Sequence, residues 1–203
     1  MDPRVAVVLA DYEIRRAAEN DLMATLGPAG ISRRDEFLIP VGPEAGTVLN
    51  LLIRSLERPR ILELGTSYGY STIYLAEAAR AAGGHVTTLE LSPEKSAFAA
   101  REVARAGLAE YVEFKVGDAL DWLRELPGPF DFVLVDLWKE LYVPCLELVY
   151  PKLAKGGFLA GDNMLSPPMS RPEAEAYRAR IRQLDLDTVL LPIGSGVELS
   201  RRR

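Results

Sequence analysis

Cysteine and histidine are scarce in this sequence, which has one of each among its 203 residues, Cys145 and His85. A single cysteine excludes a disulfide within the chain and a metal site built from several cysteines. No run of about 20 apolar residues is present, so a membrane-spanning helix is not expected. The first residues also lack the basic-then-apolar order of a secretory signal. These absences favour a protein of the reducing cytoplasm.

A strong excess of charge of one sign is also lacking. The chain carries 24 lysines and arginines against 29 aspartates and glutamates, which gives a formal net charge of -5. Such a mildly acidic chain has no field that would attract nucleic acid or an acidic membrane, so neither is expected as a partner. The basic run Arg201 to Arg203 is expected to be a solvated tail.

The length and the 48% hydrophobic content are those of an ordinary globular chain with one sizeable core. No repeat, low-complexity segment or linker interrupts it, so we expect one domain over residues 1–203. Residues 1–58 are expected to hold two leading helices, one over 4–26 and one after Pro43. Residues 59–203 are expected to form the core.

From residue 60 onward, short apolar segments alternate with helical ones. Strands are predicted over 60–64, 85–91, 111–116, 130–136 and 158–161, and helices over 70–82, from Pro93 to a stop at Gly107, over 119–126 and over 140–153. Ser92 and Pro93 have the residue types of a helix cap and a first helical position. Such alternation predicts a mainly parallel sheet with helices on both faces, and the apolar run 132–135 predicts a buried central strand.

The C-terminal part departs from this alternation. Ser170 to Glu173 has the pattern of a capping box at the start of a helix. Two strands follow, over 188–191 and 197–200, and the link between them is too short for a crossover, so they are predicted to form an antiparallel hairpin at one sheet edge. The expected fold is therefore of the α/β class, with a mostly parallel seven-stranded sheet and an antiparallel C-terminal hairpin.

Ligands of such sheets bind beyond the carboxyl ends of the strands, and the first of these ends carries a glycine turn. Gly65 and Gly69 allow the backbone to approach a ligand closely, and Ser71 stands near the start of the next helix. The spacing Gly-x-x-x-Gly differs from the Gly-x-Gly-x-x-Gly of dinucleotide binders, which disfavours a nicotinamide or flavin cofactor. The glycines also have a simpler interpretation, in which they only shape a turn.

Two acidic residues follow the next strand ends. Glu90 ends the second strand, where a carboxylate can accept both hydroxyls of a ribose, so it indicates an adenosine ligand. A solvated strand end is the alternative. Asp118, after the third strand, suits either a contact with the adenine or a helix cap.

Polar side chains also follow the fourth and fifth strands, where Asp136 ends one and Asp162 and Asn163 end the other. Adjacent strands lie about 4.8 Å apart, so these three side chains could share one cation. Carboxylate and amide oxygens favour magnesium, manganese or calcium over zinc or copper. An octahedral ion with three protein ligands keeps positions for substrate oxygens and eases the ionisation of a bound hydroxyl. The alternative is a helix cap at Asp136 and a turn at Asp162-Asn163.

These motifs occur together, in this order, in the metal-dependent class I O-methyltransferases, which include catechol O-methyltransferase and the plant caffeoyl-coenzyme A O-methyltransferases. The chain resembles that family over most of its length. The matching segments are Val41-Gly42, Leu62 to Gly65, Gly69 to Ser71, Glu90, Phe130 to Val133 with Asp136, Trp138-Lys139, Tyr142 and Gly161 to Asn163. The resemblance implies a Rossmann-like methyltransferase fold that transfers the methyl group of S-adenosylmethionine to a hydroxyl of a small catechol-like or phenolic acceptor.

The resemblance also implies a role for each matching residue. Cofactor binding falls to Val41, Glu63, Gly65, Ser71, Glu90, Asp118 and Asp136. A Mg²⁺ ion, or Mn²⁺ or Ca²⁺ in its place, falls to Asp136, Asp162 and Asn163. Lys139 is implied as the catalytic base, and Phe37, Trp138 and Pro167 as walls for the acceptor, with residues 1–58 contributing to its pocket. Bacterial members of this family are usually homodimers, so a homodimer is expected.

Some positions depart from the family pattern. Leu137 stands where catechol O-methyltransferase has a histidine, and the residues after Val197 show no clear counterpart of the acidic residue that holds the second hydroxyl of a catechol. His85 opens the second strand, away from the ligand edge, and is not expected to be catalytic. Two other functions stay open: a metal-independent methyltransferase or regulatory S-adenosylmethionine binder, and a nicotinamide-dependent oxidoreductase.

Overall fold

Seven strands form one sheet in the computed structural model, which describes residues 2–27, 29–30 and 33–203. The strands lie in the order β3-β2-β1-β4-β5-β7-β6. Their bounds are β1 Arg60–Leu64, β2 His85–Glu90, β3 Val112–Val116, β4 Phe130–Val135, β5 Leu153–Gly161, β6 Leu186–Leu191 and β7 Val197–Arg202.

Strands β1 to β5 run parallel, and β7 runs antiparallel to both of its neighbours, β5 and β6. The chain therefore reverses direction only in the C-terminal hairpin, because the link between β6 and β7 is too short to cross over the sheet. The mostly parallel seven-stranded sheet with its antiparallel hairpin confirms the predicted fold class.

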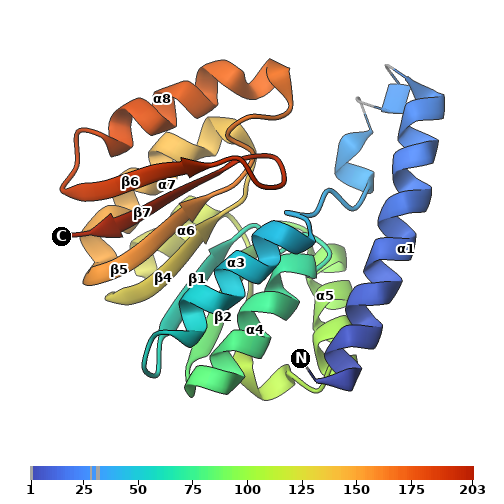
Figure 1. The fold of residues 1–203 in the computed structure, drawn as a ribbon, viewed down its shortest axis with the longest axis horizontal. Helices are drawn as coiled ribbons and strands as arrows, with labels where there is room; N and C mark the ends of the chain where they lie inside the picture. The colour runs from blue at the N-terminus through green and yellow to red at the C-terminus, as the bar shows by residue number, and fades with distance from the viewer. Residues whose placement is uncertain (1, 28, 31–32) are drawn as a thin grey trace.

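Helices cover both faces of this sheet (Figure 1). On one face α1, α3, α4 and α5 pack around a core that includes Ile61, Phe132 and Ala160, and on the other α6, α7 and α8 pack around Leu62, Val133 and Leu159. Successive residues of β1, β4 and β5 thus alternate between two buried faces, which explains why these strands are mostly apolar. The helices are α1 Pro3–Leu26, α3 Pro43–Arg54, α4 Tyr70–Ala82, α5 Pro93–Arg105, α6 Ala119–Glu125, α7 Tyr142–Val149 and α8 Arg171–Ile181, with short 3-10 helices at Arg34–Glu36, Ala109–Tyr111, Lys139–Leu141, Tyr150–Lys152 and Pro168–Ser170.

Helix starts agree with their local sequence at several points. The Ser92 side chain accepts from the Lys95 amide and Pro93 is the first residue of α5, as predicted. The side chain of Asp118 accepts from the amides of Leu120 and Asp121, so it caps α6.

The predicted boundary between α7 and β5 is wrong. The helix expected over 140–153 ends as α7 at Val149, and β5 begins at Leu153 instead of 158. Pro151 cannot continue the helical hydrogen bonding, and a shift in the β4–β5 register lets the strand pass through Gly156-Gly157. Gly156 and Gly157, which precede the predicted strand, therefore lie inside β5.

Two further expectations, both for the C-terminal part of the chain, are wrong. Ser170 precedes α8, but its side chain makes no capping hydrogen bond, so the predicted capping box does not form. Arg201 and Arg202 belong to β7 and are not a solvated tail, and Arg202 donates to the carbonyl oxygens of Tyr150 and Leu153. Within the described residues no helix is long and apolar enough to cross a membrane.

Candidate functional site

The carboxyl ends of β1, β2, β4 and β5 meet at one edge of the sheet. The backbone register pairs Leu64 with Leu89 and with Val135, and Val135 with Gly161. Gly65, Glu90, Asp136 and Asp162, which end or directly follow these strands, therefore lie at the same edge. The sheet brings together the residues that the sequence placed on separate strands.

The turn after β1 passes very close to the turn after β4. Gly65 has a φ of +97°, and a Cβ atom on it would lie 2.0 Å from the carbonyl oxygen of Asp136. The amides of Gly65 and Thr66 both donate to the carbonyl of Leu89, at 3.0 and 3.1 Å. Only glycine fits this position, because any side chain would push the two turns apart.

A small cavity lies over this turn. Three of the predicted cofactor residues besides Gly65 line it, namely Val41, Ser71 and Asp136. The remaining lining residues are Leu38, Ile39, Pro40, Thr66, Ser67, Tyr68 and Tyr70. The segment before α3 and the turn after β1 thus line one space.

Glu63 does not line this cavity but supports it from below. Its side chain is fully buried, and its two oxygens accept from the hydroxyls of Ser71, Thr72 and Thr88, each at 2.6 Å. Burial raises the pKa of Glu63 to about 7, although the three hydroxyl donors oppose the rise. Glu63 therefore fixes Ser71, which lines the cavity. Direct contact of Glu63 with a cofactor stays a prediction.

Glu90 links two turns through its carboxylate. One oxygen accepts from the Ser67 amide at 2.7 Å, and the other accepts from the Ser92 amide at 2.9 Å. Each carboxylate oxygen has a second lone pair, so these bonds leave acceptor capacity for the hydroxyls of a ribose. The cap made by Asp118 shows the structural role considered for that residue, and an adenine contact there is untested.

Asp162 is the most unusual side chain at this edge. It is 1% exposed, yet neither of its carboxylate oxygens has a hydrogen-bond partner in the described part of the chain. Burial, followed by the charge of Asp136, raises the pKa of Asp162 to about 8, and burial also raises the pKa of Asp136. Buried carboxylates without partners are costly, so a group that binds here would relieve that cost.

Asn163 turns the chain immediately after Asp162, with a φ of +55°. Its side-chain oxygen accepts from the ammonium group of Lys139 at 3.1 Å. Among the residues that the structure describes, no group of three His, Cys, Asp or Glu side chains is placed to hold a metal. The predicted ligand set, two carboxylates and one amide, lies outside that definition.

Lys139 is buried beside Asn163 and does not lie on an exposed loop. Its side chain is 9% exposed and donates to the Tyr142 hydroxyl, to Asn163 and to the Leu137 carbonyl. Burial lowers the pKa of Lys139 to about 8, although the charges of Asp136 and Asp162 act against that change. The Tyr142 hydroxyl in turn donates to the Asp162 carbonyl at 3.1 Å.

The predicted wall residues lie in three different environments. Phe37 is buried at 6% exposure, Trp138 is 40% exposed, and Pro167 is exposed after the turn that follows β5. The guanidinium carbon of Arg34 lies 4.5 Å from the ring centroid of Trp138, so the segment before α3 meets the turn after β4.

Sequence reasoning missed several residues of this site. Thr88 and Thr72 hold Glu63, and Thr66 shares a hydrogen bond with Thr88. The available signal was the pair of adjacent threonines in the middle of β2, since a polar side chain on a doubly covered strand needs a buried partner. Arg34 carried no such signal, because its position depends on how the segment before α3 folds back over the sheet.

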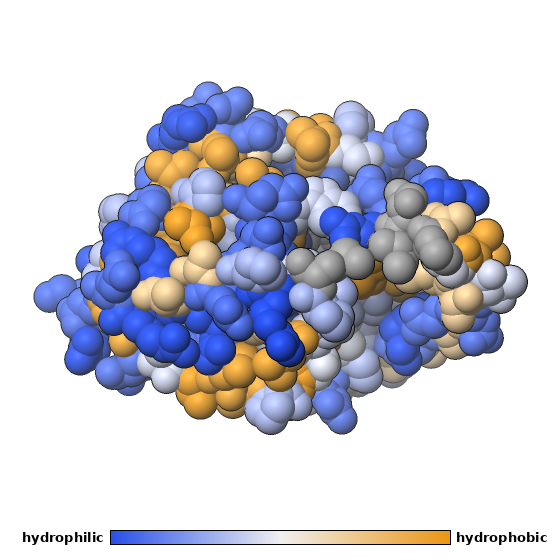
Figure 2. Space-filling view, turned by 90° about the horizontal axis from the view of Figure 1, so that it is seen from above, coloured by the Kyte–Doolittle hydropathy of each residue, from blue (hydrophilic) through white to orange (hydrophobic). Residues whose placement is uncertain are grey.

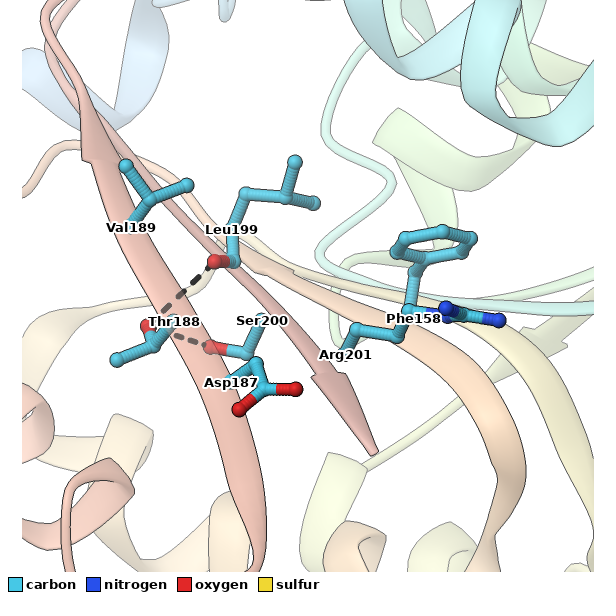
Figure 3. Close-up of a pocket in the computed structure, with 7 residues that line it drawn as sticks. All are labelled: Phe158, Asp187, Thr188, Val189, Leu199, Ser200 and Arg201. Atoms are coloured by element: carbon cyan, nitrogen blue, oxygen red, sulfur yellow. Dashed lines mark hydrogen bonds between the residues drawn. The ribbon is translucent and has the colours of Figure 1, made fainter. Parts of the chain in front are cut away.

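A second hollow, of about 240 Å³, lies on the outer strands away from this edge (Figure 3). It is lined by Phe158, Asp187, Thr188, Val189, Leu199, Ser200 and Arg201. The Thr188 hydroxyl bonds to the Leu199 carbonyl and to the Ser200 hydroxyl, so the hydroxyl groups of Thr188 and Ser200 already have partners. None of these lining residues is a predicted site residue.

The molecular surface offers no broad hydrophobic face in the view from above. Figure 2 shows small hydrophobic patches there, separated by hydrophilic residues. Exposed large apolar side chains such as Leu91, Leu165 and Trp138 come from different parts of the chain. Single exposed apolar side chains are normal and indicate no particular partner.

Comparisons with known proteins agree with this geometry. Residues 62–164 match the family model described as a methyltransferase domain. A probable O-methyltransferase of Mycobacterium tuberculosis is 31% identical over 193 residues, covering 88% of this chain and 80% of that protein. The catechol O-methyltransferase of the same organism is 40% identical over 130 residues, covering 63% of this chain and 58% of that protein.

The fold is shared with solved structures as well. An O-methyltransferase from Bacillus cereus, solved in complex with SAH, superposes with a TM-score of 0.77 at 26% identity, covering 100% of this chain and 92% of that one. The chain spans between 53% and 59% of the length of three catechol O-methyltransferases that it matches. From the matched domain and the relative aligned over most of both lengths, the chain belongs to the class I S-adenosylmethionine-dependent O-methyltransferase family, which includes the catechol and caffeoyl-coenzyme A enzymes.

Proposed function

We propose that this protein transfers the methyl group of S-adenosylmethionine to a hydroxyl of a small catechol-like or phenolic acceptor, and that a divalent cation, Mg²⁺ by preference, takes part. The observation that carries the proposal is the buried carboxylate of Asp162, which has no hydrogen-bond partner in the described structure. Family membership supports the methyl donor, and the names of catechol O-methyltransferase relatives support the acceptor class.

The residues at the sheet edge fit a hard cation. Asp136, Asp162 and Asn163 would hold it through two carboxylates and one amide oxygen, which are the donors that Mg²⁺ prefers. Mn²⁺ or Ca²⁺ would find the same donors. When bound, the cation would lower the pKa of the acceptor hydroxyl and orient it. The buried Asp162 carboxyl group, whose two oxygens have no hydrogen-bond partner among the described residues, is the structural feature that supports this assignment.

Lys139 is proposed as the residue that takes the hydroxyl proton. Its ammonium group already contacts the side chain of Asn163, so it lies beside the proposed ligand set. Tyr142 holds it there by accepting a hydrogen bond from Nζ. Catalysis then consists mainly of alignment, since the sulfonium methyl is an activated electrophile and the acceptor oxygen needs only to face it.

The cofactor is proposed to occupy the cavity over the turn after β1. Gly65, Ser71, Val41 and Asp136 line that cavity, while Glu63 fixes Ser71 from beneath. Glu90 would bind the ribose with its remaining lone pairs, and Asp118 the adenine. Residues 1–58 would close the acceptor side through Phe37, with Trp138 and Pro167 as further walls. Residues 1–203 are proposed to form one methyltransferase domain, and the protein is proposed to be a homodimer in the cytoplasm.

The test is methyl transfer to a panel of vicinal diols and phenols, read by mass spectrometry, with Mg²⁺ and with EDTA. Product is expected with Mg²⁺ and not with EDTA, and Asp162→Ala is expected to lose nearly all of it. Asp121→Ala is the matched control, because Asp121 is exposed on α6 and pairs with Arg124. Transfer that continues undiminished in EDTA would remove the cation from the proposal and favour a metal-independent methyltransferase.

A direct binding measurement separates the other possibilities. Calorimetry is expected to show binding of S-adenosylmethionine and no binding of a reduced nicotinamide cofactor. Thermal melts with the methyl donor, Mg²⁺ and a catechol in combination are expected to show stabilisation by the catechol only when the other two are present. Stabilisation by the reduced nicotinamide cofactor would instead favour an oxidoreductase.

A further inference from the structure

The two halves of α1 contact the rest of the protein in different ways. The buried residues of this helix are Val5, Val8, Leu9 and Tyr12, all in its first half. Over residues 13–26, which the structure describes throughout, no residue is buried. The core therefore holds the first half of the helix, and the second half depends on other contacts.

Polar contacts of α1 converge on the turn after β1. The Tyr12 hydroxyl donates to the Tyr68 carbonyl, and Glu13 accepts from the Tyr70 hydroxyl at 2.6 Å. The guanidinium carbon of Arg15 stands 4.0 Å from the centroid of the Tyr68 ring. Tyr68 and Tyr70 both line the cavity over this turn, so α1 holds residues that border the space proposed for the cofactor.

Glu19 extends this contact to the segment before α3, which Figure 1 shows crossing between α1 and the start of α3. One of its carboxylate oxygens accepts from the Leu38 amide, and the other accepts from Arg15 at 2.7 Å. Leu38 is the first of four consecutive residues, 38–41, that line the cavity. A single carboxylate, 19% exposed, thus joins Leu38 to the guanidinium that stacks on Tyr68.

The bond to Glu19 is the main polar tie of residues 38–41. Of their backbone amides, only that of Leu38 has a hydrogen-bond partner in the described part of the chain. The nearby ion pair of Asp35 with Lys95 is weak, because the Asp35 side chain is 67% exposed. Loss of the Glu19 carboxylate would therefore release this segment from α1 and leave the core contacts of the helix unchanged.

We propose that Glu19 is a positioning residue for the methyl donor, and that through Leu38 and Arg15 it holds the segment before α3 and the turn after β1 at the spacing that the donor requires. This inference rests on the proposed function of the cavity that they line. Glu19 itself does not line that cavity, so it acts through these two partners. A site built from separate segments binds more tightly when they are already fixed in place, because ordering them on binding costs free energy.

The test is calorimetric binding of SAH to wild type and to Glu19→Ala. We expect Kd to rise by about tenfold in the variant, which is the loss typical of one hydrogen bond to a charged group. Glu19→Gln should raise Kd by only about threefold, because its amide oxygen can still accept from the Leu38 amide while the contact with Arg15 is lost. Asp21→Ala is the matched control and should leave Kd unchanged, because Asp21 is exposed on the same helix.

Two further measurements separate positioning from a general loss of structure. In steady-state kinetics with a catechol and Mg²⁺, the KM for S-adenosylmethionine should rise with the Kd in Glu19→Ala, whereas kcat at saturating donor should change by less than about twofold. In amide hydrogen exchange, SAH should slow exchange at Leu38 in wild type much more than in Glu19→Ala.

The outcomes distinguish this inference from the proposed function. An equal Kd for SAH in wild type and Glu19→Ala, even with a lower unfolding free energy, would show that Glu19 only stabilises the fold and would overturn the inference alone. A fall in kcat without a change in the KM for the donor would also overturn it. If Glu19→Ala does not fold, Glu19→Gln decides by the same comparison of Kd. A wild-type protein that does not bind SAH would overturn the proposed function as well.

Discussion

Gly65 and Asp136 approach each other so closely that a single added carbon on Gly65 would lie 2.0 Å from the Asp136 carbonyl oxygen. The two residues follow adjacent parallel strands, β1 and β4. The turn after β1, which is proposed to bind the cofactor, therefore packs against Asp136, a proposed metal ligand. The position of the proposed cation relative to the methyl donor therefore depends on a contact that has no room for a side chain.

Gly65→Ala tests that contact. The substitution combines a strained φ of +97° with a clash against backbone, so we expect a loss of about 3 kcal/mol or more in unfolding free energy. Gly83→Ala is the control, because Gly83 also has a positive φ, +70°, but its nearest neighbour is the flexible Arg58 side chain at 3.6 Å. Its expected loss is about 1 kcal/mol. Urea denaturation of both variants measures the difference, and equal losses would contradict the clash.

The buried Glu63 predicts a dependence of stability on pH. Its pKa is raised from 4.5 to about 7 in the folded protein, so between these values the folded state keeps a proton that the unfolded chain has lost. This contribution therefore favours folding most at low pH, falls as pH rises from 4.5 to 7 and levels off above, with a total change of about 3 kcal/mol.

Glu63→Gln removes the titrating group and keeps its shape. As pH rises from 4.5 to 7, the unfolding free energy of this variant is expected to increase relative to that of wild type. Urea denaturation at several pH values measures it. A difference that does not vary with pH would show that Glu63 is ionised in the folded state across the whole range.

Helix α3 begins just after Val41, which lines the cavity over the turn after β1, and it makes a polar contact with α4. Asn50 donates to the Tyr74 carbonyl at 2.8 Å and to Glu77 at 2.6 Å, and Arg54 pairs with the other oxygen of Glu77. The Glu77 side chain is only 4% exposed, so it relies on these two partners.

Arg54→Ala is expected to cost about 2 kcal/mol, because it leaves a buried carboxylate with Asn50 alone, and the partial exposure of Arg54 limits the loss. Arg124→Ala, which breaks an exposed pair with Asp121, should cost less than about 0.5 kcal/mol. Thermal or urea unfolding of the two variants measures both losses in unfolding free energy. Similar losses would mean that the burial of Glu77 does not strengthen its ion pair with Arg54.

The alternation of apolar strands and amphipathic helices predicted the fold because each parallel strand is buried on both faces. Strand β1 was predicted with the same bounds that the structure shows, Arg60–Leu64, since a glycine turn and a polar residue delimit it. Strand β5 was predicted too short, because glycines in a sequence indicate a break while a register shift can absorb them inside a strand. Ser170 has the residue pattern of a cap without the geometry, which depends on how the preceding turn is folded.

The candidate site was predictable where it depends on strand ends and unpredictable where it depends on long-range packing. Asp136, Asp162 and Asn163 lie at one edge of the sheet because they follow parallel strands that end there, and that follows from the order of strands alone. Arg34 meets Trp138 because a segment before the sheet folds over it, and no local pattern specifies that return. Glu63 was assigned to the cofactor, but its hydroxyl partners show that burial decides its immediate contacts.

Asp162→Asn separates stability from cation binding. The wild-type carboxyl group is 1% exposed and has no hydrogen-bond partner in the described structure, so an amide of the same shape, which has neither a charge to bury nor a proton to take up on folding, should raise the unfolding free energy without metal by about 1 kcal/mol. The same change should abolish stabilisation by Mg²⁺, which for wild type would reach about 2.7 kcal/mol at a hundredfold excess over Kd. Residues kept for binding at the expense of stability show this pair of effects.

Urea unfolding with EDTA and with Mg²⁺ measures both quantities, and Asp121→Asn, on the exposed surface of α6, should change neither. A variant that is less stable in EDTA and still responds to Mg²⁺ would show that Asp162 is a structural residue and that the cation binds elsewhere.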